Sequence, residues 1–141
     1  MEEQKEDLIN RPNHYCKFNV ELESIDVVDL FCFNLGSCIK YALRYRDKGT
    51  PVMDLEKALF YAKRIQNNER KLNEAIQELS DSKAVLQIFK DKTKDAITYE
   101  TINTLFQCLY DSSFSILIDL LEIRLKFEKD FQEKKETIIN G

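Results

Sequence analysis

The sequence predicts an all-α protein, a helical bundle of long helices with a short extended arm at its N-terminus. Among 141 residues there are only 3 glycines and 2 prolines, so residues that interrupt helices are rare. Charged residues make up 33% of the chain, and most are Lys, Arg or Glu, whose straight side chains favour helices. Apolar residues after residue 24 recur at intervals of three and four, which is the helical period.

The first half of the chain is expected to form an arm and two helices. Residues 18–22 alternate apolar and polar, as in a short strand or extended arm. Ser24 is a suitable N-cap for a first helix over residues 24–46. The stretch "DKGTPVMD" then marks a sharp connection, and Asp54 is expected to cap a second helix over residues 55–79.

The second half is expected to add a short helix and a long helical segment. Breaks near Ser80 and Thr98 bound the short helix. The remaining segment lacks Gly and Pro up to residue 140, and its apolar residues step by four and three, a heptad-like seam. The seam consists of Ile102, Phe106, Leu109, Ser113, Ile116, Leu120, Ile123 and Phe127. We expect this surface to form a homo-oligomer, most simply a symmetric dimer; the alternative is a hairpin with the helix at residues 55–79 of the same chain.

Composition also limits the classes of function and the setting. No apolar stretch approaches the roughly 20 residues that span a bilayer, and the acidic start "MEEQKEDLIN" is unlike a signal peptide, so a cytoplasmic protein without membrane contact is expected. The four cysteines show no C-x-x-C spacing, which favours reduced packing residues over disulfides or zinc ligands. We therefore predict no metal site.

Positive charge is concentrated in residues 36–71. This segment contains nine Lys and Arg and four acidic residues, although the whole chain carries a net charge of -4. Such a local basic region suits a small anionic ligand, while duplex nucleic acid generally needs a broad positive face. Gly36, Lys40 and Arg44 share one helical stripe. Arg and Lys together match a phosphate, and a glycine within a helix indicates a close approach, by a ligand or by a neighbouring helix. The alternative for the two cations is a solvated helix face.

Aromatic residues lie beside these cations. Tyr15, Tyr41, Tyr45 and Tyr61 suit either the edge of the core or base stacking. His14, the only histidine, lies in the turn "RPNHY", where a ligand contact and a structural hydrogen bond are equally consistent with the sequence. The candidate ligand-binding residues are His14, Tyr15, Gly36, Lys40, Tyr41, Arg44 and Lys48.

The stretch from "RPNHY" through "LGSCIKYALRYRDKGTPVMDLEKALFYAKRI" resembles a small domain common in tailed phages and prophages, mostly of unknown function and in some phages described as a nucleotide kinase. The resemblance covers residues 11–65. The matching positions are Pro12, His14, Tyr15, Ile25, Asp26, Val27, Gly36, Lys40, Tyr41, Arg44, Lys48, Gly49, Asp54, Leu55, Lys57, Ala58 and Tyr61. Ser37 and Phe60 replace the Asn and Trp that are usual in the pattern. By this resemblance residues 1–79 would form a nucleotide-kinase-like domain and residues 80–141 a helical C-terminal extension packed on it or on another subunit.

The resemblance implies a nucleotide or another phosphorylated small molecule as ligand and a role in phage nucleotide metabolism, in the host cytoplasm. It leaves open whether the protein is an enzyme, because the chain has no G-x-x-x-x-G-K-[ST] loop. A kinase would also need Mg²⁺ with its nucleotide. The rival hypotheses are a non-enzymatic phage accessory protein that inhibits a host defence system, by binding a host protein or sequestering a nucleotide signal, and a structural module that only oligomerises.

Overall fold

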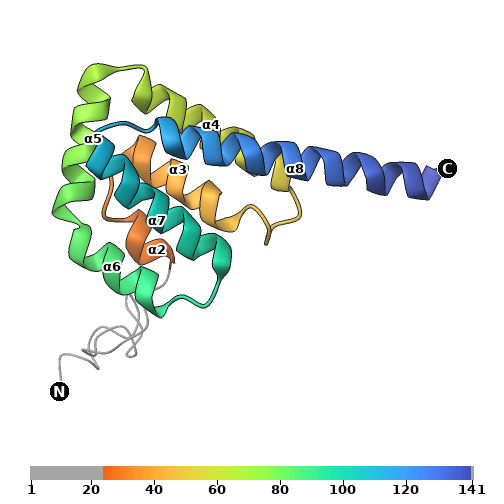
Figure 1. Ribbon diagram of the computed structural model, residues 1–141, viewed down its shortest axis with the longest axis horizontal. Helices are drawn as coiled ribbons and strands as arrows, with labels where there is room; N and C mark the ends of the chain where they lie inside the picture. Colours follow the sequence, from red (N-terminus) through yellow and green to blue (C-terminus); the bar gives the residue numbers. More distant parts are fainter. Residues whose placement is uncertain (1–23, 141) are drawn as a thin grey trace.

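A computed structural model describes residues 24–140, and this part of the chain forms helices and no strand. In order they are α2 (Ser24–Val28), α3 (Phe33–Arg44), α4 (Pro51–Gln66), α5 (Glu69–Asp81), α6 (Lys83–Lys92), α7 (Ala96–Asp111) and α8 (Ser115–Asn140) (Figure 1). The predicted all-α fold is confirmed. The predicted arm at residues 18–22 lies outside the described residues.

The predicted first helix over residues 24–46 is wrong in its continuity, because the chain turns between α2 and α3. The amides of Leu30 and Phe31 donate to carbonyls only three residues earlier, which tightens and ends α2. The amide of Cys32, just before α3, donates to both carboxylate oxygens of Glu78 on α5, at 3.1 and 3.3 Å. A residue 46 positions away thus stabilises the start of α3.

The predicted second helix over residues 55–79 is two helices, and it begins earlier than expected. Pro51 occupies the first turn of α4, where its fixed φ and missing N–H fit, and Thr50 is the N-cap residue. Asp54 is therefore not a cap but a buried residue of the first turn, 1% exposed. The chain breaks again after Gln66, and the side chain of Asn68 accepts from the amide of Lys71 at 3.0 Å to cap α5.

The predicted continuous seam from Ile102 to Phe127 is also wrong, because a turn separates α7 from α8. Ser112 adopts a left-handed conformation with φ 52°, which ends α7. Phe114 follows, fully buried, and its amide donates to the side-chain oxygen of Gln66 on α4 at 2.7 Å. The helix therefore restarts with a new register, in which Leu117 and Leu121 face the core and Ile123 and Phe127 are exposed.

The core lies between α3, α4, α7 and α8. α4 packs along both α3 and α8, and α8 runs back along α4 in the opposite direction (Figure 1). The alternative of an intramolecular antiparallel pair is thus present, and of the two helices in residues 55–79 it is α4 that pairs with α8. The C-terminal half of α8 projects beyond the other helices (Figure 1). The predicted domain division after residue 79 falls near the end of α5 and stays a prediction.

A buried cation joins α8 to the rest of the bundle. Arg124 is 6% exposed and donates to the hydroxyl of Thr101 at 2.8 Å and to the carboxylate of Glu100 at 2.6 Å, both on α7. Its guanidinium also lies 5.9 Å from the ring centre of Tyr45, just after α3. Within residues 24–140, no helix is both long enough and apolar enough to cross a membrane.

Candidate functional site

The helix α3 carries four of the seven predicted site residues and lies side by side with α4. Lys40 is exposed and Arg44 is one-third exposed, and both side chains lie against the ring of Tyr41. Lys48 lies exposed in the loop between the two helices. His14 and Tyr15 lie outside the described residues, so their predicted contacts with this stripe remain predictions.

Gly36 is buried, and the backbone that approaches it belongs to its own chain. A Cβ atom at this position would lie 3.1 Å from the carbonyl oxygen of Val28 and 3.5 Å from that of Phe31. The first distance is shorter than most Cβ contacts in proteins. The sequence left open whether a ligand or a neighbouring helix approaches Gly36. In the structure it is the neighbouring helix α2 and the turn after it.

Three cations surround the ring of Tyr41. The nitrogen of Lys40 lies 5.7 Å from the ring centre, the guanidinium carbon of Arg44 lies 4.8 Å away, and the nitrogen of Lys57 on α4 lies 5.2 Å away. Distances below about 6 Å are those of favourable cation–π contacts. α4 therefore adds Lys57 to the cationic stripe that the spacing on α3 predicted.

Further aromatic rings continue this surface. The ring of Tyr61 lies parallel to that of Tyr41, with centres 6.4 Å apart, and meets Phe33 and Phe60 edge-on at 5.5 and 5.2 Å. Phe33 is 73% exposed and Phe60 is 58% exposed. We call this the aromatic–cationic surface; it comprises Phe33, Lys40, Tyr41, Arg44, Lys57, Phe60 and Tyr61.

Phe33 and Phe60 were not predicted as site residues. Both are large apolar residues, a type that is ordinarily found in the core. The signal that could have found them is a helical-wheel comparison, because each projects away from the buried residues of its own helix.

A buried ion pair underlies the surface. The carboxylate oxygen Oδ2 of Asp54 lies 3.6 Å from Nε of Arg44, and neither atom has a hydrogen-bond partner among residues 24–140. The distance is too long for a hydrogen bond, so the contact is electrostatic. Because Asp54 balances the charge of Arg44, the positive charge open to an anion comes mainly from Lys40 and Lys57.

The cysteines of the described region are free. Burial raises the pKa of Cys38 and of Cys108 to about 12, so both thiols stay protonated in the core. Cys32 is exposed, and partial burial together with the carboxylate of Glu78 raises its pKa. Among residues 24–140, no group of three or more His, Cys, Asp or Glu side chains is placed to hold a metal ion.

Comparison with known proteins found one family that matches the first part of the chain. Residues 9–63 match the DUF3310 family, whose function is unknown. The match confirms the resemblance to a small domain of unknown function over nearly the expected range, and within the described residues it covers α2, α3 and most of α4. It therefore includes every residue of the aromatic–cationic surface. No curated protein and no solved structure matches the chain.

The DUF3310 match ends at residue 63, before the end of α4. The helices α5 to α8 thus lie outside it, as expected for a C-terminal half that adds to a smaller domain. The description of the family carries no activity, so the nucleotide-kinase part of the resemblance stays an expectation.

Proposed function

We propose that the first half of the chain binds a nucleotide or a related phosphorylated small molecule on the aromatic–cationic surface. The observation that carries this proposal is the cluster of three cations within 6 Å of the Tyr41 ring, next to exposed aromatic rings. Lysines would hold the phosphates, and the exposed faces of Phe33 and Phe60 would stack on a base. His14, Tyr15 and Lys48 are proposed to complete the site.

The proposed setting is nucleotide metabolism in the host cytoplasm during phage infection. This rests on the resemblance in the N-terminal half and on the chemistry of the surface. Catalysis would require Mg²⁺ held between phosphates and carboxylates, and the carboxylate buried beneath the surface, that of Asp54, faces Arg44. Ligand binding without catalysis therefore has the stronger support.

The first test is mass spectrometry of small molecules released from the purified, denatured protein, followed by calorimetry with ATP, dTMP and inorganic phosphate. Lys40→Ala and Lys57→Ala should each weaken nucleotide binding about ten-fold, the loss of one charge-assisted contact. Lys83→Ala on α6 is the matched control and should bind like wild type, since Lys83 is an exposed lysine outside the surface. If wild type binds no nucleotide, or if both variants bind like the control, the proposal is wrong.

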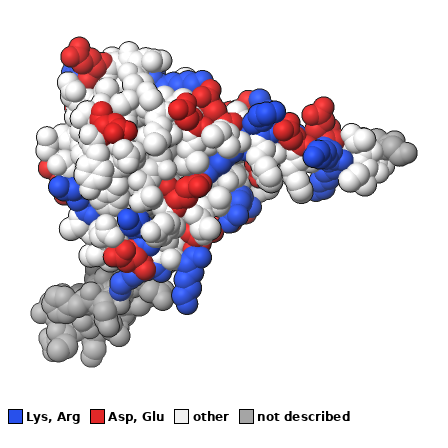
Figure 2. Space-filling view, viewed as in Figure 1, with Lys and Arg blue, Asp and Glu red and all other residues white. Residues whose placement is uncertain are grey.

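The rival is inhibition of a host defence system through the C-terminal half. After residue 79 the chain has nine basic and eleven acidic residues, and Figure 2 shows the two signs interspersed along α8. A one-signed acidic face that imitates nucleic acid has little support from this distribution. A host complex that needs residues 80–141, formed by a protein without nucleotide affinity, would replace the present proposal.

We also propose that the chain self-associates through its C-terminal helices. α8 carries large apolar side chains that the bundle leaves exposed, including Ile123, Phe127 and Phe131. Such surface on a soluble protein typically marks an interface. Light scattering at micromolar concentration should report a species twice the chain mass; a monomer would contradict it.

A further inference from the structure

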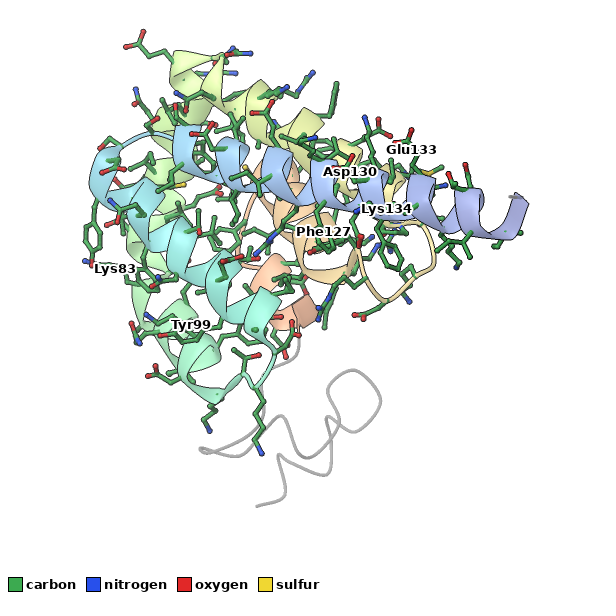
Figure 3. All side chains as sticks on the ribbon, turned by 45° about the vertical axis from the view of Figure 1, so that its right-hand side comes forward. Lys83, Tyr99, Phe127, Asp130, Glu133 and Lys134 are labelled. Atoms are coloured by element: carbon green, nitrogen blue, oxygen red, sulfur yellow. The ribbon has the colours of Figure 1, made fainter. Side chains whose placement is uncertain are left out.

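One row of side chains runs the length of α8 and is exposed except at Leu120, which is partly buried. The row consists of Ile116, Leu120, Ile123, Phe127, Phe131, Lys134 and Ile138, and we call it the outer stripe. At 3.6 residues per turn these positions fall within about 80° of the helix circumference. Phe127 is 66% exposed and Ile138 is 81% exposed, whereas Leu117 and Leu121 on another side of α8 are buried. Figure 3 shows Phe127 and Glu133 on different edges of α8.

The spacing of the outer stripe is symmetric about Phe127. Counted from Phe127, stripe residues occur four, seven and eleven positions earlier and again four, seven and eleven positions later. A row that reads the same in both directions can meet a second copy of itself running the opposite way, related by a two-fold axis. We infer that two copies of this chain pair through antiparallel α8 helices with Phe127 at the axis.

This pairing would place apolar residues opposite one another along about 33 Å of helix. Ile123 of one copy would face Phe131 of the other, and Ile116 would face Ile138. Leu120 would meet Lys134, whose aliphatic stem can cover it while the amine reaches water. The projecting end of each α8 thus lies along the bundle-packed half of the other, which explains why this helix extends beyond its own bundle (Figure 1).

The charges beside the stripe favour a second copy over a partner of one sign. Residues 126–136 contain four lysines and four acidic residues, so this segment is neutral and does not repel itself. Lys126 and Asp130, 3.4 Å apart, lie on the same edge of the helix. In the antiparallel pair Lys126 of one copy would lie between Lys126 and Asp130 of the other, so this edge stays neutral in the dimer as well. A strongly basic or acidic partner would meet no complementary net charge on this segment.

The inference rests on the proposed self-association. A variant in the outer stripe and a control variant outside it test whether the stripe is the interface. Ile123→Asp puts a charge in the stripe, and Ile139→Asp is the matched control, because the two isoleucines are 67% and 71% exposed but only Ile123 belongs to the stripe. Light scattering should report a dimer for wild type and for Ile139→Asp, and a folded monomer for Ile123→Asp. A dimer that tolerates Ile123→Asp would overturn the stripe as the interface.

Whether the two α8 helices run antiparallel or parallel is tested by spin labels at Asp119→Cys, in a protein with Cys16→Ser and Cys32→Ser. Position 119 is eight residues before Phe127, so the antiparallel pair separates the two labels by about 24 Å along the helix axis. A parallel pair would instead bring them to about 10 Å, the distance between packed helices. The short distance would overturn the antiparallel inference and leave self-association standing, whereas a wild-type monomer would overturn both.

Discussion

Arg44 and Asp54 form a contact that the sequence suggests for neither of them. Spacing on α3 assigns Arg44 to an anion site, and Asp54 resembles a helix cap. In the fold the carboxylate of Asp54 is buried beneath Arg44, and the facing atoms Nε and Oδ2 have no hydrogen bond within the described part of the chain. A buried carboxylate is costly when its counter-charge is removed, so Arg44 has a structural role apart from any ligand.

We expect Arg44→Ala to lower the free energy of unfolding by about 1–3 kcal/mol, since it leaves Asp54 buried without its partner. The effect should fall below that of a fully buried pair because Arg44 is one-third exposed. Adding Asp54→Asn should recover part of the loss, and urea unfolding of the four proteins in this cycle measures the coupling. Arg70→Ala is the control, an exposed arginine expected to cost less than about 0.5 kcal/mol. Strict additivity of the two substitutions would show that the pair is not coupled.

At the scale of elements, the ends of the helices depend on side chains that reach backbone amides. Asp95 is the N-cap of α7: its carboxylate accepts from the amide of Thr98 at 2.9 Å and from the Thr98 hydroxyl at 2.7 Å. Arg46, in the loop after α3, adds an ion pair at 2.9 Å. Partial burial acts to raise the pKa of Asp95, but the Thr98 hydrogen bonds and the charge of Arg46 outweigh it and hold the pKa below its usual 3.8.

Because the folded-state pKa of Asp95 is lowered, its stabilising effect is present at neutral pH and is lost as the pH falls through that pKa. Asp95→Ala should therefore cost about 1 kcal/mol at pH 7 and progressively less below pH 3.8. Urea unfolding at several pH values measures this difference. Asp91→Ala is the control, because the exposed Asp91 caps no helix and accepts from the side chain of Gln87 within α6. An equal cost at all pH values would contradict the cap role.

For the whole molecule, α8 is held by Arg124 as well as by apolar packing. Its guanidinium bonds to two side chains of α7 and lies over Tyr45, so one residue links α8 to α7 and to the end of α3. Charge-assisted hydrogen bonds of this kind are stronger than neutral ones, and a buried arginine also fills volume.

We expect Arg124→Ala to destabilise the protein by about 3 kcal/mol through the loss of these bonds and of packing. Lys126→Ala, two positions along α8, removes an exposed lysine that forms a helical i, i+4 pair with Asp130 and should cost less than about 0.5 kcal/mol. Thermal unfolding followed by circular dichroism compares the two. Equal melting temperatures for the two variants would show that Arg124 does not anchor α8.

The candidate site was predictable in the two cations of α3, but not in Lys57 of α4 and only partly in its aromatic residues. Four-residue spacing brought Lys40 and Arg44 together correctly, because both lie on one helix whose geometry is local. Phe33 and Phe60 joined them only when α3 packed on α4, a contact between segments distant in the chain. The reason for a glycine at position 36, the close approach of α2 and the turn after it, likewise depended on a turn that helical periodicity did not reveal.

The sequence alone determined the all-α class and the concentration of positive charge on α3 and α4, because helix propensity, apolar period and charge are properties of neighbouring residues. It also carried the resemblance that the family match confirms. Only the tertiary structure decided where the helices break and which side of α8 is buried. Those choices depend on long-range partners, such as Glu78 for the amide of Cys32 and Gln66 for that of Phe114. A side chain from 46 or 48 residues away can satisfy a backbone amide and so stabilise the start of a new helix where periodicity would continue the previous one.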